Sequence, residues 1–303
     1  MSSKFSNCVY VIGTGSPELA DYNPTTKQLY KNVSGFFSHQ PTPGLGGFHE
    51  HESQAASDIV QVWGDAEIHH IRALDSDGSG DLRWYRDALL KCLDLGGNAI
   101  ISSSLGVTLP DGVDLDEAAI GSLGIATLND LSRRFVNALD LHSKYYVPVI
   151  DEIEAISKEL RAKGCILVAA SGNESMTTPA YPASSPHQLA IGSEQNGLMS
   201  DFSNKGCDFS TDGEDQPLYG WQQVSYGSGT SFSAPDVAGI FGRILQDTNW
   251  TQDQLVAACA MMARHKRAPS KAVAYYDKTS GWGSLSWLWD RFKTQDFYKH
   301  SAV

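Results

Sequence analysis

Residues 229–239 constrain the fold more than any other stretch, because they join a polar turn to a helix that is apolar on almost every side. Their sequence is Gly-Thr-Ser-Phe-Ser-Ala-Pro-Asp-Val-Ala-Gly, and apolar residues continue to Leu245. A helix with so narrow a polar edge is predicted to be buried in the core. Pro235 is tolerated in the first turn of a helix, so we expect the helix to begin just before it.

Ser231 is predicted to lie at the start of this helix, where backbone N–H groups lack partners within the helix and create a positive end. A hydroxyl held there can act as a nucleophile beside donors that stabilise an oxyanion. The alternative is that Ser231 or its neighbour only caps the helix, as Ser and Thr often do. These residues alone leave both interpretations open.

The chain of 303 residues can bury a large core, and its 41% hydrophobic and 10% aromatic residues are ordinary for a globular enzyme. We expect one domain over 1–303. The net charge of −12 argues against nucleic acid or an anionic membrane surface as the main partner. No apolar run approaches the roughly 18 residues of a spanning helix, and residues 1–7 do not resemble a secretory signal.

The five cysteines are widely spaced, and none has a CxxC partner or a histidine at metal-ligand spacing along the chain. They are Cys8, Cys92, Cys165, Cys207 and Cys259. We interpret them as mostly buried thiols in a reducing compartment and expect no metal site. A disulfide framework is the alternative.

Apolar runs that end in loops of small or polar residues predict parallel strands at 8–12, 67–74, 98–104 and 164–170. Helices are predicted from Glu52 onward, over 82–95, from about 148 to 162, and over 251–264. In parallel α/β sheets, ligands and catalytic groups gather where the carboxyl ends of the strands meet. The loops that follow these strands are therefore the expected site.

The stretch 229–239 resembles the nucleophile motif of the subtilisin-like serine proteases, with Asp236 where that family usually has His. Further segments in the same order extend the resemblance over about 8–290. It implies a three-layer α/β fold with a mostly parallel central sheet flanked by helices. It also implies Ser231 as the nucleophile and a peptide or protein as the substrate.

Two further motifs follow the family pattern. Ser171-Gly172-Asn173 resembles the segment whose Asn donates to the oxyanion, and an Asn here separates the chain from the sedolisin branch, which has Asp. Residues 51–57 resemble, more distantly, the segment whose first His is the general base. The resemblance therefore implies oxyanion binding by Asn173 and proton transfer by His51, with His49 as a rival two residues away.

The main departure from the family lies at Gly13. Val-Ile-Gly-Thr-Gly at 11–15 resembles the family motif Val-Ile-Asp-Thr-Gly, whose Asp orients the catalytic His. Removing that carboxylate leaves the imidazole without a fixed tautomer and costs about 10⁴ in kcat in a relative of the family. A partner's carboxylate, a bound anion or a nearby side chain can replace it. The side chains considered are Glu50, Glu52, Asp75 and Asp21.

The edge that binds the substrate is also implied by the resemblance. Ser104, Leu105 and Gly106 match a segment whose backbone pairs with the substrate as an added strand. Gly78, Ser79 and Gly80 match a loop that lies along the substrate. For this second segment, a plain acidic turn and a Ca²⁺ site are the alternatives, although the EF-hand Glu and spacing are absent.

The segment 107–141 is longer than the connection the family usually has there. We interpret it as an insertion that narrows specificity, shields the site or docks a partner protein. Residues 1–7 leave no room for a pro-segment, and 60–67 is too short for a common Ca²⁺-binding loop. These features predict a trimmed member that is cytoplasmic or particle-borne.

Three functions are compatible with these observations. The first is a serine endopeptidase that forms an acyl-enzyme on Ser231, with His51 as the general base. The second is a catalytically silent protein of the same fold that binds a peptide or a partner. The third is an enzyme that was deliberately inactivated at Gly13.

Overall fold

The computed structural model describes residues 5–106, 140–248, 250–264 and 277–293, and within 140–147 it describes the backbone alone. Its main sheet has eight strands in the order β2-β3-β1-β4-β5-β6-β7, with β8 also paired to β6. All pairs are parallel except β6 with β7. The strands are β1 (Cys8–Gly13), β2 (Gly35–His39), β3 (Glu67–Arg72), β4 (Ile100–Ser103), β5 (Ile166–Ala170), β6 (Leu189–Gln195), β7 (Leu198–Met199) and β8 (Phe209–Asp212). A separate antiparallel pair contains β9 (Gln216–Tyr219) and β10 (Val224–Gly227).

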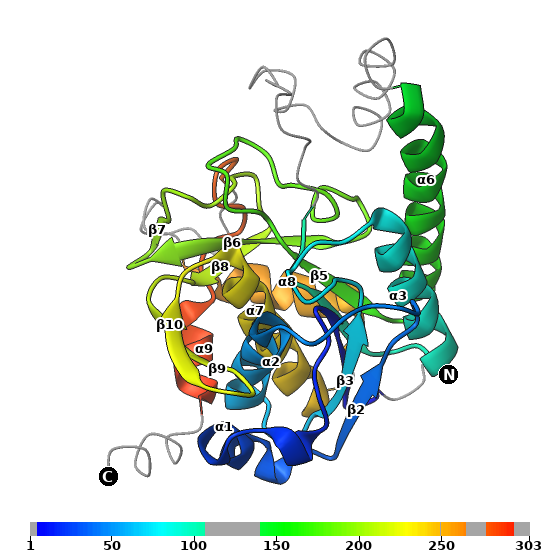
Figure 1. The fold of residues 1–303 in the computed structure, drawn as a ribbon. Helices are drawn as coiled ribbons and strands as arrows, with labels where there is room; N and C mark the ends of the chain where they lie inside the picture. Colours follow the sequence, from blue (N-terminus) through cyan, green and yellow to red (C-terminus); the bar gives the residue numbers. More distant parts are fainter. Residues whose placement is uncertain (1–4, 107–139, 249, 265–276, 294–303) are drawn as a thin grey trace.

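Helices cover both faces of the sheet, so the protein is a three-layer α/β structure as predicted. Figure 1 shows α2 beside α7 on one face and α3 beside α6 on the other. Alternate side chains of β1 explain the layers, because Val9 and Val11 join the core under α7, whereas Tyr10 and Ile12 join the core under α3 and α6. The helices are α1 (Pro24–Leu29), α2 (Glu50–Val62), α3 (Leu82–Leu95), α6 (Asp140–Ala162), α7 (Thr230–Gln246), α8 (Gln252–Met262) and α9 (Ser286–Phe292).

The helix α7 is buried along most of its length, as its sequence predicts. It runs parallel to α2 and very close to it. A Cβ on Gly242 would lie 2.1 Å from Cε3 of Trp63, and one on Gly239 would lie 3.1 Å from the carbonyl oxygen of Ile59. A side chain at Gly242 would clash with the Trp63 ring, and one at Gly239 would require Ile59 to shift by a few tenths of an ångström. Because the two helices are parallel, their first turns lie side by side at the carboxyl end of the sheet.

Some predicted boundaries were wrong. The helix α6 begins at Asp140 rather than near 148, and it contains Pro148 in its interior. Strand β3 ends at Arg72 instead of Leu74, because the N–H groups of Ala73 and Leu74 both donate to the carbonyl of Gly13. Thr251 is the N-cap of α8 and not its first residue, and it forms a capping box with Gln254. The segment 107–139, most of the predicted insertion, lies outside the described residues.

The cysteines are free thiols, four of them buried, which agrees with the prediction. Cys8, at the start of β1, is the partly exposed one. Among the described helices, none is both long enough and apolar enough to cross a bilayer.

Candidate active site

Ser231 is the second residue of α7 and has an unusual exposure for this part of the chain. It is partly exposed, whereas every other residue from Gly229 to Gly242 is buried. The fold therefore leaves Ser231 partly exposed at the positive end of a helix whose next three turns are buried. This is the position in which a serine can reach a substrate.

The backbone carbonyl of Ser231 has a partner from outside its helix. Pro235, four residues later, has no N–H with which to donate to this carbonyl, and it lies in the second turn of α7 rather than in the first. The hydroxyl of Ser104, just beyond β4, donates to the carbonyl instead, at 2.8 Å. Pro235 thus leaves the Ser231 carbonyl available, and the hydrogen bond from Ser104 fixes Ser231 to the end of β4.

Asn173 lies just beyond the carboxyl end of β5 and contacts the residue before Ser231. Its side-chain carbonyl Oδ1 accepts hydrogen bonds from the backbone N–H of Thr230 at 2.9 Å and from Thr230 Oγ1 at 3.0 Å. Thr230 Oγ1 also accepts from the N–H of Gly172 at 3.1 Å. Because Oδ1 accepts from a backbone N–H, the amide orientation is fixed and the Nδ2 group is the donor left for a substrate oxygen.

His51 lies in the first turn of α2, and its ring packs against the residue after Ser231. The ring centroids of His51 and Phe232 are 5.7 Å apart. Loss of water around the ring, with a smaller contribution from His49, lowers the pKa of His51 to about 4. Within the described residues, no hydrogen bond joins the His51 ring to Ser231 or to a carboxylate. The rival His49 is exposed and caps α2, because its Nδ1 accepts from the backbone N–H of His51.

The space beside Gly13 is filled by Glu52, the residue after His51. A Cβ on Gly13 would lie 3.1 Å from Glu52 Oε2 and 3.5 Å from its Cβ and Cγ. Glu52 is only 1% exposed. A glutamate from α2 therefore lies where the aspartate side chain of the family would begin.

The Glu52 carboxylate is hydrogen bonded to residues other than His51. Its Oε1 lies 2.8 Å from Nδ1 of His70, on β3, and its Oε2 accepts from the backbone N–H of Gly15. Burial raises the pKa of Glu52, although His70 and Gly15 offset part of this effect. His70 is a neighbour of the site that the sequence analysis missed, and its Nε2 is buried without a hydrogen-bond partner among the described residues.

The other three acids considered for the triad are engaged elsewhere or exposed. Glu50 Oε1 accepts from the N–H of Gln222 at 2.6 Å. Asp75 Oδ1 accepts from the N–H groups of Gly46 and Ser76. Asp21 is exposed in a short 3₁₀ helix, Leu19–Asp21. Of the four, only Glu52 reaches the position of the missing aspartate.

Comparison with known proteins decides the family. The model of the subtilase family matches residues 43–283, which is most of the chain. The chain belongs to the subtilase family. Gly13 lies before the matched segment.

Three curated proteins are similar to this subtilase, and the chain spans less than half the length of each. It is 27% identical over 201 residues to the thermophilic serine proteinase of Bacillus sp. (strain AK1), which covers 65% of this chain and 40% of that protein. It is 34% identical over 126 residues to thermitase of Thermoactinomyces vulgaris, 40% of each chain. It is 40% identical over 81 residues to the cell wall-associated protease of Bacillus subtilis (strain 168), 25% of this chain and 9% of that protein.

A solved structure supports the fold. A crystal structure of a cold adapted subtilisin-like serine proteinase superposes with a TM-score of 0.63 at 17% identity, covering 94% of this chain and 90% of that one. The three-layer, mostly parallel architecture is therefore the subtilisin-like fold, as the sequence predicts.

The segments predicted to bind substrate lie in different surroundings. Ser104 uses its hydroxyl to hold α7, and a Cβ on Gly106 would lie 3.5 Å from the Cβ of Ala180. The exposed turn at 78–80 is closed by Asp77, whose Oδ1 accepts from the N–H and hydroxyl of Ser79. Substrate binding by either segment stays a prediction.

The departure at Asp236 lies in the interior of this subtilase. Asp236 is 3% exposed, and burial together with Asp58 on α2 raises its pKa, whereas Lys293 lowers it. Asp236 thus belongs to a buried group of charges between α2, α7 and α9. It has no role in the first turn of α7.

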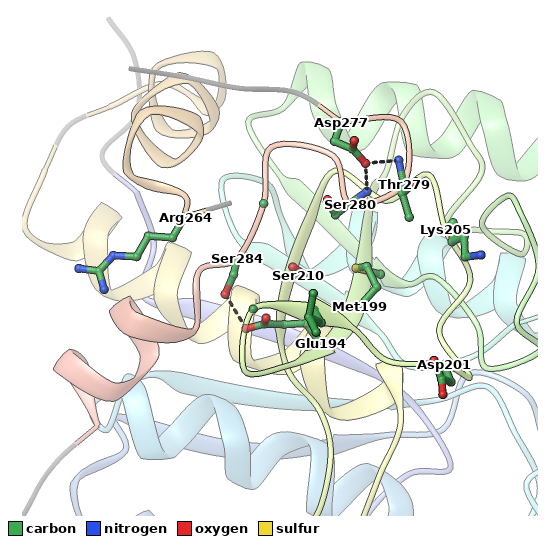
Figure 2. A pocket seen from close by; sticks show the side chains of 13 residues that line it. Glu194, Met199, Asp201, Lys205, Ser210, Arg264, Asp277, Thr279, Ser280 and Ser284 are labelled. Carbon is green, nitrogen blue, oxygen red and sulfur yellow. Dashed lines mark hydrogen bonds between the residues drawn. The ribbon is translucent and has the colours of Figure 1, made fainter. Parts of the chain in front are cut away.

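A cavity of about 400 Å³ lies elsewhere, and it contains none of the residues predicted for catalysis. Figure 2 shows that Glu194 and Ser284 meet at its wall, where the Ser284 hydroxyl donates to Glu194 Oε1 at 2.6 Å. The other Glu194 oxygen is buried and has no hydrogen-bond partner in the part of the chain that the structure describes. No sequence motif indicated this cavity.

Proposed function

We propose that this subtilase hydrolyses peptide bonds as a serine endopeptidase whose general base works without a hydrogen-bonded carboxylate. The observation that supports this proposal best is the arrangement around Ser231. Asn173 is hydrogen bonded to Thr230, the His51 ring packs against Phe232, and Ser231 between them is partly exposed.

Each side chain has a distinct role in the proposed reaction. Ser231 Oγ attacks the peptide carbonyl carbon while His51 takes its proton. The Nδ2 group of Asn173 and the backbone N–H of Ser231 donate to the oxyanion that forms. His51 then returns the proton to the leaving amine as the C–N bond breaks, and a water molecule hydrolyses the resulting ester by the same steps. The His51 ring has to move toward Ser231 when substrate binds, as catalytic groups often do.

The lack of an orienting carboxylate implies slow catalysis. No negative charge fixes the tautomer of His51 or stabilises its protonated form, so a rate reduced by about 10⁴ is expected relative to a complete triad. Desolvation of the ring and the neighbouring His49 lower the pKa of His51, and this also disfavours its protonated form.

The pH dependence of the reaction tests this account of His51. Its pKa of about 4 lies below the usual 6.5, so the ring is neutral and able to accept a proton at any pH above about 4. We expect kcat/KM to be nearly constant between about pH 5 and 8 and to fall only near pH 4. A kcat/KM profile with a peptide substrate measures this. An acidic limb between about pH 6 and 7 would contradict this account, because an imidazole with an ordinary pKa titrates there.

The lowered pKa of His51 also makes the stability of the fold depend on pH. The unfolded chain binds a proton on His51 as the pH falls through 6.5, whereas the folded chain does not until about 4. His51 therefore destabilises the fold progressively over this interval. Replacing it with glutamine is expected to reduce the loss of stability between these pH values, as measured by denaturant unfolding.

A silent binding protein is the second candidate. It is favoured by one observation, namely that the His51 ring is hydrogen bonded to neither Ser231 nor an acid within the described residues. Such a protein would bind a peptide or a partner at the same cleft without cleaving it.

A fluorophosphonate probe separates the two candidates. We expect the unaltered chain to be labelled and Ser231→Ala not to be labelled, with peptide hydrolysis falling about 10²-fold. This loss is smaller than the roughly 10⁶ of a complete triad, because the absent acid already accounts for about 10⁴.

The matched control for this test is Ser233→Ala. Ser233 is on the same helix but fully buried, and its hydroxyl donates to the carbonyl of Thr211. This variant should label like the unaltered chain. Equal silence of all three proteins, together with retained peptide binding, would support the binding protein and overturn the peptidase.

A further inference from the structure

We propose that Cys8, Glu67 and His69 form a binding site for a thiophilic divalent cation, with Zn²⁺ as the fitting ion. Cys8 begins β1 and Glu67 begins β3, and the parallel register pairs these two residues directly. His69 follows Glu67 by two positions, so its side chain is on the same face of the sheet. One potential ligand atom from each residue lies within 4.8 Å of the other two.

The three ligand atoms already converge without an ion. Cys8 Sγ lies 3.1 Å from Glu67 Oε1, and His69 Nε2 lies 2.8 Å from the same oxygen. In a tetrahedral zinc site, ligand atoms lie about 3.4 to 3.6 Å apart, given the usual Zn–S, Zn–N and Zn–O distances. To bind the ion, the distances from Glu67 Oε1 to Cys8 Sγ and to His69 Nε2 would each have to increase by about half an ångström. Rotation about side-chain bonds can provide this increase.

The chemistry of the set points to zinc rather than to a hard cation. A thiolate and an imidazole nitrogen are preferred by Zn²⁺, and Ca²⁺ and Mg²⁺ prefer oxygen ligands. The site is partly open, because the Glu67 side chain is 34% exposed and Cys8 is only partly buried. A water molecule can complete the four ligands from this side.

The surroundings of His69 resemble those of a metal ligand. Its second nitrogen, Nδ1, lies 2.9 Å from Nε2 of His39 on β2. The ring is also packed against Phe37, with centroids 4.6 Å apart, and against the edge of Tyr10. A histidine that binds zinc commonly donates its other N–H to a neighbouring acceptor, which fixes the ring. Here His39 can accept that N–H while Nε2 of His69 faces Glu67 and Cys8.

The proposed ion would join β1 to β3 at the end of the sheet opposite to Ser231. Cys8 and Gly13 are five residues apart on β1, a separation of about 16 Å. The site would stabilise the fold without entering the peptidase reaction. Binding would also release the thiol proton of Cys8, since the thiolate is the ligand.

Cobalt provides the direct test, because Co²⁺ in a thiolate site absorbs in the near ultraviolet. The full chain, freed of metal with a chelator, is titrated with Co²⁺ and then with Zn²⁺. We expect one equivalent to produce the thiolate–cobalt band and Zn²⁺ to displace it. Cys8→Ser should lose the band, and His69→Gln should bind Zn²⁺ at least about 10²-fold more weakly.

Two controls make the result specific. Cys92→Ala removes a thiol on α3 that is outside the cluster, and it should keep the band. In the unaltered chain, Zn²⁺ should slow alkylation of the Cys8 thiol by iodoacetamide about 10²-fold, because the free thiolate is the species that reacts. This measurement uses no variant, so a folding defect of a variant cannot produce its result. No band, a band that persists in Cys8→Ser, or an unchanged alkylation rate would overturn the proposal.

Discussion

The double substitution Gly13→Asp with Glu52→Gly is expected to raise kcat for peptide hydrolysis by about 10² to 10⁴. The pair removes the glutamate that lies beside Gly13 and returns a carboxylate to the end of β1. An acid at this position would orient the His51 ring and stabilise its protonated form, which is worth up to about 10⁴ in kcat. Steady-state kinetics with one peptide substrate measures the gain.

The two single substitutions are the controls, and neither should reproduce the gain. Gly13→Asp alone would bring a new side chain to 3.1 Å from Glu52 Oε2, so two carboxylates would compete for one buried space. We expect that variant to be less stable and no faster. Glu52→Gly alone leaves His70 without its acceptor and supplies no acid. A folded double variant with unchanged kcat would show that His51 is not the base.

Asn173→Leu is expected to lower kcat by about 10² to 10³ and to change KM little, because an oxyanion donor acts mainly in the transition state. The substitution keeps the approximate size of the side chain but removes the Nδ2 donor. It also removes the acceptor of the Thr230 N–H, so part of any effect has a structural origin.

Thr230→Val separates the two effects of Asn173. This variant loses the two hydrogen bonds of Thr230 Oγ1, to Asn173 Oδ1 and from the backbone N–H of Gly172, and it keeps both the Nδ2 donor and the hydrogen bond from the backbone N–H of Thr230 to Asn173. We expect kcat to fall less than about tenfold. If Thr230→Val and Asn173→Leu reduced kcat equally, Asn173 would only position the first turn of α7.

Much of the fold could be predicted from the sequence because its signals are local. Apolar residues on almost every side of α7 predict a buried helix, which the structure confirms. The helix α3 has the predicted bounds, Leu82–Leu95. The predicted start near 148 was wrong for α6, because a proline favours the first turn of a helix, whereas Pro148 lies inside this one. The short β9 and β10 strands were missed, since four-residue segments contain too little periodicity to be recognised.

A residue of the candidate site could be predicted only where a single sequence motif contains both that residue and the backbone segments that position it. Ser231 and Asn173 each follow such a motif. The position of Glu52 beside Gly13 depends on how the first turn of α2 meets β1, and the two residues are far apart in sequence. The cluster of Cys8, Glu67 and His69 has the same origin, because strand register brings together side chains that have no ligand spacing along the chain.

The contact of Gly242 with Trp63 has a consequence for how activity can be adjusted in this subtilase. The parallel helices α2 and α7 carry His51 and Ser231 on their first turns, and their separation is fixed by a glycine about 16 Å further along α7. An added methyl group at Gly242 would push α2 and α7 apart. The distance that a proton has to cross between Ser231 and His51 would then increase. The rate of the proposed peptidase reaction would therefore depend on a residue that lies far along α7 from Ser231.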